Sequence, residues 1–272
     1  MNRATESFKK IVKKPIYYTQ LCIKAFFVFN QPIAVLASYF SKKNVPKIVA
    51  LRNGLTIELS DDTDDISTVF IVFVKRDYGK LNADVVLDVG ANIGLFSLYC
   101  AAEGVGKVYS FEPSKDSYEI LVRNIARNGF EDIVVPCKKA VTSVGGATVK
   151  FNAQSSVLNK IGEVTDNNYD LVETVSLSDI IAEFRLEIID LIKMDIEGGE
   201  YDVAYNLDLS TAEKIREFRM EYHEGNSDSL TVHFENLGFR KTLLTRESDM
   251  VGNIFFVNIK ARSDGGYSNR MR

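Results

Sequence analysis

A chain of 272 residues can bury a core of ordinary size and fits one α/β domain, with or without an appendage. Its formal net charge of -4 is unevenly spread, because residues 1–50 hold nine Lys or Arg and one acid, Glu6, and so carry +8, which leaves -12 for residues 51–272. Such an acidic body excludes a broad nucleic-acid footprint, since phosphate binding depends on basic patches. Three widely spaced Cys predict no disulfide framework and no metal site, and the first residues do not resemble a secretory signal, so we expect a reducing, cytoplasmic location.

Residues 1–46 form a basic extension that we expect to be helical. Residues 25–40 (AFFVFNQPIAVLASYF) are apolar, but Asn30, Gln31 and Pro32 interrupt them, and sixteen residues are too few for a membrane span. Two interpretations stay open. The extension is either a pair of helices packed on the domain, or it includes an interfacial helix that Lys side chains hold at anionic lipid, on the inner membrane face.

The next segment predicts a β-hairpin and then a helix. Residues 47–60 (KIVALRNGLTIELS) alternate on both sides of Asn53-Gly54, a dipeptide typical of tight hairpin turns. A helix is expected over residues 65–77.

From residue 84 onward, strands and helices alternate, which predicts a parallel sheet covered by helices on both faces. We expect residues 140–175 to be largely irregular, the last two strands to be antiparallel, and residues 261–272, which lack apolar content, to be disordered. The expected strands are 85–89, 107–111, 133–136, 189–194, 215–222, 240–244 and 254–259, and the expected helices are 94–103, 115–128, 177–184, 199–205 and 229–237.

The stretch VVLDVGANIG places Asp88 near the end of a strand and two glycines, Gly90 and Gly94, in the turn to a helix. Ligands of parallel sheets bind beyond the carboxyl ends of strands, where glycine permits close backbone approach and free N–H groups of the helix face the ligand. We expect Asp88 to accept a bond from a ligand amine or to orient the turn. Dinucleotide sites need G-x-G-x-x-G, whereas Ala91 and Asn92 fill part of the phosphate space here. A ligand with an amino-acid group and an adenosine, without phosphate, therefore fits better.

Glu112 follows the next strand, 22 residues after the first glycine of that turn. Nucleotide-binding α/β folds place there the acid that binds ribose hydroxyls, and the alternative is an acid at a helix N-terminus.

Further carboxylates and a histidine follow the later strands. Asp195 and Glu197 end the strand before Gly198-Gly199, where they could bind substrate hydroxyls, hold a cation or act as a general base. Glu197 and Glu200 also fit a helix cap. His223 could deprotonate a hydroxyl, or be a surface or capping residue.

Six motifs in this order and spacing resemble the FkbM family of S-adenosylmethionine-dependent methyltransferases, over about residues 47–260. The basic extension lies outside the resemblance, and Gly199 stands where the family often has Ala. The motifs are Val85–Gly94, Phe111–Pro113, Asn124–Asn128, Lys139–Val141, Leu177–Asp179 and Lys193–Glu200.

The resemblance implies a Rossmann-like, seven-stranded, mostly parallel sheet whose last strand is antiparallel, within a domain of residues 47–260. It also implies S-adenosyl-L-methionine as cofactor and O-methylation of a hydroxyl on a sugar, glycolipid or other small molecule. By position, it places Asp88, Gly90, Asn92 and Gly94 around the methionine part, Glu112 at the ribose, Pro113 and Ser114 near the adenine, and Asp195 and Glu197 at the transferred methyl. It also implies that Ala91, Ala140 and Asp195 bind the cofactor, and that residues 140–175 supply contacts to the adenine and the substrate.

Met194-Asp-Ile-Glu-Gly stands where enzymes that methylate nucleic-acid bases usually have Asn- or Asp-Pro-Pro-aromatic, which favours hydroxyl acceptors and no nucleic-acid partner. The general base is expected to be Asp195, Glu197 or His223, with no metal. The alternatives are a non-catalytic cofactor-binding module, a nicotinamide oxidoreductase, and a methyltransferase acting on a protein or lipid at a membrane surface. The sequence indicates neither the acceptor nor the oligomeric state.

Overall fold

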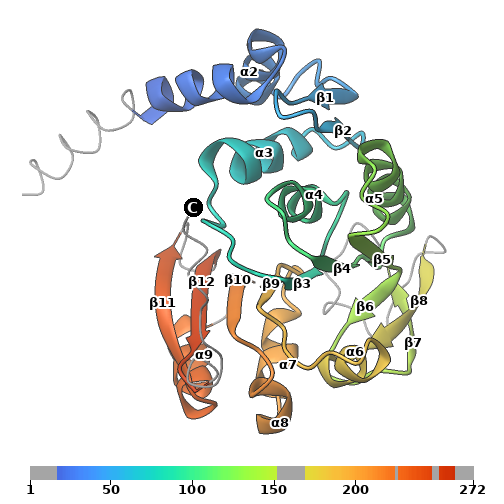
Figure 1. Cartoon of the computed structure of the whole chain (residues 1–272), viewed down its shortest axis with the longest axis vertical. Helices are drawn as coiled ribbons and strands as arrows, with labels where there is room; N and C mark the ends of the chain where they lie inside the picture. The colour runs from blue at the N-terminus through green and yellow to red at the C-terminus, as the bar shows by residue number, and fades with distance from the viewer. Residues whose placement is uncertain (1–16, 152–168, 224–225, 247–250, 261–272) are drawn as a thin grey trace, which may run out of the picture.

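A seven-stranded sheet forms the middle layer of the molecule (Figure 1). The computed structural model describes residues 17–151, 169–223, 226–246 and 251–260, so the expectation for residues 261–272 lies outside the described residues. The strand order is β11-β12-β10-β9-β3-β4-β5, and every strand except β12 runs in the same direction, which confirms the predicted topology. The strands are β3 (Val85–Val89), β4 (Lys107–Phe111), β5 (Val134–Cys137), β9 (Leu191–Met194), β10 (Glu217–His223), β11 (Phe239–Arg246) and β12 (Val251–Asn258).

Helices cover both faces of this sheet, as predicted (Figure 1). Because strand side chains alternate between faces, Val86 of β3 joins one apolar cluster while its neighbours Leu87 and Val89 join another on the opposite face. The first cluster includes residues of α4 (Leu95–Ala102) and α5 (Lys115–Asn128), and the second includes residues of α6 (Leu177–Glu183), α7 (Glu200–Tyr205), α8 (Leu209–Ala212) and α9 (Ser227–Asn236).

The N-terminal part packs on the first of these faces. A helix over residues 17–28 and α2 (Pro32–Ser41) contribute Leu21, Ala25 and Val35 to the apolar cluster that also holds α4. The hairpin β1 (Ile48–Ala50) and β2 (Thr56–Glu58) is confirmed, and so is a helix after it, α3 (Asp65–Val69), which continues as a π-helix over Phe70–Lys75. Among the described residues, no helix combines the length and hydropathy that a bilayer span requires.

The expectation of an irregular stretch over residues 140–175 was wrong for its described part. A separate three-stranded sheet, in the order β6-β8-β7, forms from β6 (Lys139–Val141), β7 (Thr148–Phe151) and β8 (Asp170–Val175). These strands are short and carry charged residues among the apolar ones, so their alternation is weak in the sequence. Pairing across more than thirty residues, as between Lys139 and Glu173, decides the structure here.

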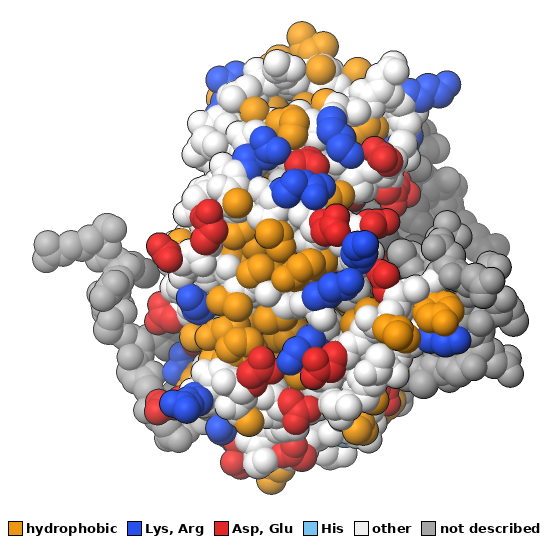
Figure 2. Space-filling view, turned by 90° about the vertical axis from the view of Figure 1, so that its right-hand side faces the viewer, with side chains coloured by type: hydrophobic (Ala, Val, Ile, Leu, Met, Phe, Trp, Pro, Cys, Tyr) orange, Lys and Arg blue, Asp and Glu red, His pale blue; other side chains and the backbone are white. Residues whose placement is uncertain are grey.

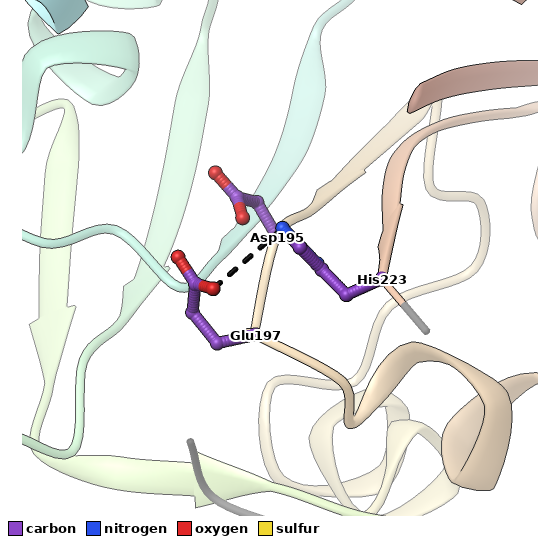
Figure 3. A group of neighbouring side chains, drawn as sticks. All are labelled: Asp195, Glu197 and His223. Atoms are coloured by element: carbon purple, nitrogen blue, oxygen red, sulfur yellow. Dashed lines mark ion pairs between the residues drawn. The ribbon is translucent and has the colours of Figure 1, made fainter. Parts of the chain in front are cut away.

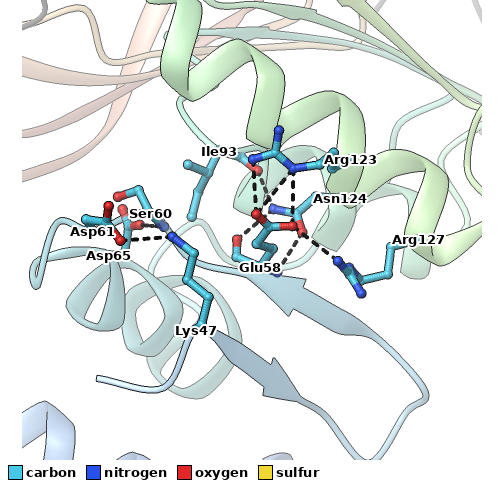
Figure 4. A network of polar contacts seen from close by, with 9 residues as sticks. All are labelled: Lys47, Glu58, Ser60, Asp61, Asp65, Ile93, Arg123, Asn124 and Arg127. Atoms are coloured by element: carbon cyan, nitrogen blue, oxygen red, sulfur yellow. Dashed lines mark hydrogen bonds and ion pairs between the residues drawn. The ribbon is translucent and has the colours of Figure 1, made fainter. Parts of the chain in front are cut away.

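Two asparagines of α5 fasten the hairpin to the domain. The side-chain amide of Asn124 accepts from the backbone N–H of Glu58 at 2.7 Å and donates to its carbonyl at 2.9 Å (Figure 4). Asn128 makes the same pair of bonds with Thr56. One turn apart on the helix, they pair with alternate residues of β2 and so take the place of a neighbouring strand. Asn124 also donates to the carbonyl of Ile93 at 2.9 Å, in the turn between β3 and α4.

Candidate functional site

The carboxyl ends of four neighbouring parallel strands bring the predicted residues to one edge of the sheet. Glu112 follows β4, Gly90 follows β3, Asp195 follows β9, and His223 ends β10, in the spatial order of the strands. Adjacent strands lie about 4.8 Å apart, so the first and last of these positions are separated by roughly 14 Å. The edge is therefore a row, with the predicted ribose acid at one end and the predicted base at the other.

The glycine turn is shaped by contacts within the chain. Gly90 has φ +77°, and a Cβ there would lie 1.8 Å from the backbone carbonyl oxygen of Asp195. Gly94 has φ +89°, and its Cβ would lie 2.4 Å from Leu121 of α5. Asn92 also adopts positive φ, at +49°, with an exposed side chain. Gly90 thus lets the turn lie against the end of β9, and Gly94 lets it lie against α5, whatever ligand the turn meets.

Sequence reasoning missed Lys193, a buried lysine within β9. Its Nζ donates to the carbonyl of Gly90 at 2.7 Å and lies 3.5 Å from Asp88 and 3.8 Å from Asp195. Burial would lower the pKa of Lys193, but the negative charges of Asp88 and Asp195 outweigh this and raise it. The sequence signals were a lysine inside the apolar run LIKM and its place at the start of the motif Lys193–Glu200, neither of which was read as a role for the lysine.

Asp88 is fully buried beneath the turn. One of its oxygens accepts from the Ser97 hydroxyl at 2.6 Å, and the other faces Lys193. Of the two roles considered for Asp88, these contacts correspond to orienting the turn, because Lys193 joins it to the carbonyl of Gly90.

Glu112 stands between two loops with both carboxylate oxygens engaged by backbone. It accepts from the N–H of Asn92 at 2.7 Å and from the N–H of Ser114 at 2.8 Å. Burial raises the pKa of Glu112 to about 7, although both N–H donors and Lys193 lower it. Each oxygen keeps further acceptor capacity, which two ribose hydroxyls could use.

The residues predicted near the adenine are buried. Ser114 is the N-cap of α5, where its hydroxyl accepts from the N–H of Ser117, and Pro113 precedes it. Ala140 lies in β6. Ala91 of the glycine turn, also predicted to bind the cofactor, is buried and donates its N–H to the carbonyl of Phe111. Contact between these residues and a cofactor remains a prediction.

Asp195, Glu197 and His223 converge at the other end of the row (Figure 3). One ligand atom from each lies within 4.8 Å of the others, close enough for a cation to bridge, so the cation-binding alternative remains open on geometry. Glu197 projects outward with a 71% exposed side chain and φ +55°, and one of its oxygens is 3.6 Å from Nε2 of His223.

Glu200, the first residue of α7, holds this cluster in place. It is fully buried, and it accepts from the backbone N–H groups of Ile196 and Gly198 at 2.8 and 2.9 Å, which ties the turn before α7 together. The helix-cap alternative for Glu197 and Glu200 was wrong, because Gly199, the N-cap of α7, makes no side-chain cap hydrogen bond, and Glu200 binds the turn that precedes the helix. Glu200 also lies 3.2 Å from Nδ1 of His223, which turns Nε2 towards Glu197.

His223 is positively charged at neutral pH in this arrangement. Burial alone would lower its pKa, but the hydrogen bond and charge of Glu200, with the charges of Glu197 and Asp195, raise it to about 9. The pKa of Glu197 is also raised, by partial desolvation of its carboxylate next to the turn and by the charge of Asp195, although most of the side chain is exposed.

A sheet of this strand order, with the glycine turn after β3 and a buried acid after β4, has the topology of the Rossmann-like S-adenosylmethionine-dependent methyltransferases. Comparison with known families shows to which family of methyltransferases the chain belongs. The methyltransferase FkbM domain matches residues 88–240, more than half of the chain, and the chain therefore belongs to the FkbM family of methyltransferases. Its cofactor is S-adenosylmethionine, and the nicotinamide alternative is excluded.

Several of the curated proteins that this chain resembles are named as methyltransferases. The methyltransferase sdnD of Sordaria araneosa is 29% identical and covers 57% of this chain and 73% of its own length. The hexuronic acid methyltransferase AglP of Haloferax volcanii is 25% identical, with 62% and 69% covered, and the 31-O-demethyl-FK506 methyltransferase FkbM of Streptomyces tacrolimicus is 29% identical, with 66% and 83% covered. The solved structure of M. capricolum TrmK with S-adenosyl-homocysteine aligns with a TM-score of 0.43 at 11% identity, over 66% of this chain and 64% of that one, which is too distant to support an argument about function.

Proposed function

We propose that the protein transfers a methyl group to a hydroxyl of a sugar or a similar small molecule. The observation that carries this proposal is the cluster of Asp195, Glu197 and His223, beside the glycine turn and open to solvent through Glu197. Carboxylates at that place can accept the proton that a hydroxyl must lose. The relatives AglP and FkbM, named for a hexuronic acid and for 31-O-demethyl-FK506, support an oxygen acceptor.

S-adenosylmethionine, when bound, supplies a methyl group already activated by the positive charge of the sulfonium. The residues of the chain must bind it, align the acceptor oxygen and receive the acceptor's proton. Alignment can contribute roughly 7–11 kcal/mol in favourable cases, and a positioned base adds a factor of about 10²–10⁴. Glu112 would hold the ribose hydroxyls, and its two backbone bonds fix its orientation.

Glu197 is the base in this proposal. His223 carries a proton at neutral pH because its pKa is raised to about 9, and its positive charge, 3.6 Å from a carboxylate oxygen of Glu197, positions that residue. A base works best when its pKa approaches the working pH, and the pKa of Glu197 is raised in that direction. Asp195, held near Lys193, would orient the acceptor hydroxyl.

The test is mass spectrometry of glycans and lipids from cells with and without the gene. We expect a species heavier by one methylene only in cells that carry the gene, and its formation in vitro from labelled S-adenosylmethionine. If the purified protein binds S-adenosylmethionine but methylates nothing in either extract, the alternative of a non-catalytic cofactor-binding module replaces this proposal.

A lipid-linked acceptor at a membrane surface is the second candidate. It is favoured by one observation, the apolar side chains that the N-terminal helices expose to solvent. In the same experiment it would appear as methylation confined to the lipid extract.

A further inference from the structure

The helix over residues 17–28 is apolar on two opposite faces. One face buries Leu21 and Ala25 against the domain. The other exposes Ile23, Phe26 and Phe27, the last with 76% of its surface accessible. Positions i, i+3 and i+4 form a continuous stripe on a helix. A helix that is apolar on all sides is normally buried on all sides, so the exposed stripe indicates that this helix contacts a further apolar surface.

The next helix, α2, repeats the pattern without a single charged residue. Val35 faces inward and is buried, while Ile33, with 73% accessible, and Phe40 point outward one heptad apart. The two helices meet at their far ends, where the rings of Tyr18 and Phe40 lie 5.8 Å apart, edge to face. We call the exposed set the N-terminal apolar face, made of Tyr18, Ile23, Phe26, Phe27, Ile33 and Phe40.

Positive charge accompanies this face. Lys24 and Lys43 are exposed on the two helices or next to them, and the first sixteen residues of the sequence add Arg3, Lys9, Lys10, Lys13 and Lys14 against one acid. In Figure 2, a few hydrophobic side chains protrude at the upper end of the molecule, where α2 lies in Figure 1, with Lys and Arg side chains on either side of them. The rest of the chain carries -12.

We propose that the N-terminal apolar face docks on the surface of a bilayer that contains anionic phospholipids. The aromatic and aliphatic side chains would enter the boundary between headgroups and acyl chains, and the lysines would lie at the phosphates. An anionic surface attracts the +8 segment and repels the -12 body, which fixes the orientation. A second copy is a poorer occupant, because it would bring two segments of +8 together. This proposal does not depend on the identity of the methyl acceptor.

The experiment is co-sedimentation of the full chain with vesicles of phosphatidylcholine alone or of an equimolar mixture with phosphatidylglycerol. We expect binding to the mixture to be at least roughly tenfold stronger, because each lysine near an anionic surface contributes about 1 kcal/mol. Added salt should weaken it, since the Debye length falls from about 10 Å at 0.1 M to about 3 Å at 1 M. Equal sedimentation with both lipids would overturn the proposal.

Two variants test whether the N-terminal apolar face makes the contact with the vesicle. The double variant Phe27→Glu, Ile33→Glu should lose vesicle binding, whereas Val232→Glu, which alters a 57% exposed side chain of α9, should keep it. Unchanged circular dichroism and S-adenosylmethionine affinity would show that the double variant folds. Undiminished vesicle binding by the folded double variant would contradict the proposal. So would light scattering that shows a dimer in the wild type, a monomer in the double variant and no vesicle binding by either, since the face would then join two copies.

Discussion

Glu112 is held by two backbone N–H groups and is almost completely buried, and this combination sets its chemistry. Burial raises the pKa of Glu112 to about 7, so near neutral pH part of the population is protonated before a ligand binds. Ribose hydroxyls donate to the ionised form, so ligand and proton compete for Glu112.

The competition predicts pH-dependent cofactor binding. As the pH falls below about 7, the dissociation constant for S-adenosylmethionine should rise, by up to about tenfold for each pH unit of the decrease, because the pKa of Glu112 would be lower in the complex than in the free protein. Isothermal titration calorimetry can follow it. Glu112→Gln should bind weakly at every pH and lose this slope. A wild-type affinity that is constant between pH values well below and above the pKa would remove Glu112 from ribose binding.

Substitutions of Asp195 and Glu197 should lower turnover much more than they lower the affinity for the cofactor. We expect Asp195→Ala to abolish turnover while affinity for S-adenosylmethionine falls less than about tenfold, because alignment of the acceptor is lost and the cofactor loop is kept. Glu197→Gln should lower kcat by about 10²–10⁴ with an unchanged KM for the cofactor.

The exposed acid Glu213, after α8, provides the control, since Glu213→Gln should leave both constants unchanged. Turnover like that of the wild type in Asp195→Ala would exclude this residue from the mechanism.

At the scale of elements, α5 links the N-terminal hairpin to the cofactor turn through Asn124. The same buried side chain bonds the backbone of Glu58 in β2 and the carbonyl of Ile93. Arg123 and Arg127 add ion pairs to Glu58, and the two side-chain hydrogen bonds, foremost that of Arg123, hold the pKa of Glu58 below its ordinary value. The hairpin is therefore part of the support of the cofactor turn.

Removing that side chain should affect both stability and binding. Asn124→Ala leaves buried backbone groups unpaired, so we expect a loss of roughly 2–4 kcal/mol in the free energy of unfolding and weaker cofactor binding. Asn128→Ala removes the equivalent bonds to Thr56 without touching Ile93, and should cost stability while cofactor affinity stays unchanged. Urea unfolding and calorimetry measure the two effects, and identical behaviour of the variants would contradict the link.

The elements were largely predictable wherever local pattern and tertiary packing agree. The strands Val85–Val89 and Lys107–Phe111 have the predicted bounds, since each is an apolar run closed by a turn. The sheet of β6, β7 and β8 was missed because its pairings are distant and its strands short.

At the site, the sequence could bring Glu112, Asp195 and His223 to one edge, because parallel strands end on the same side. It could not indicate the bond from Lys193 to the turn, or the contact of Gly90 with the carbonyl of Asp195. Both depend on how β3 and β9 lie side by side.

For the whole molecule, the charge on His223 predicts how stability varies with pH. Its pKa in the folded chain is about 9, above the ordinary 6.5, so its contribution is complete below pH 6.5 and is lost as the pH rises through 9. The size is on the order of 3 kcal/mol, at about 1.4 kcal/mol per pH unit. Urea unfolding from pH 6.5 to above 9 should show this loss in the wild type, and His223→Gln should flatten it. A variant with the same pH dependence as the wild type would show that Glu200 and Glu197 do not hold the proton.

The most direct measurement is a crystal structure of the protein with S-adenosylhomocysteine bound. The ribose hydroxyls should lie on the carboxylate of Glu112, the amino-acid part over the turn from Gly90 to Gly94, and the sulfur towards Asp195 and Glu197. A product molecule at any other edge of the sheet, or one whose sulfur points away from those two acids, would contradict the account.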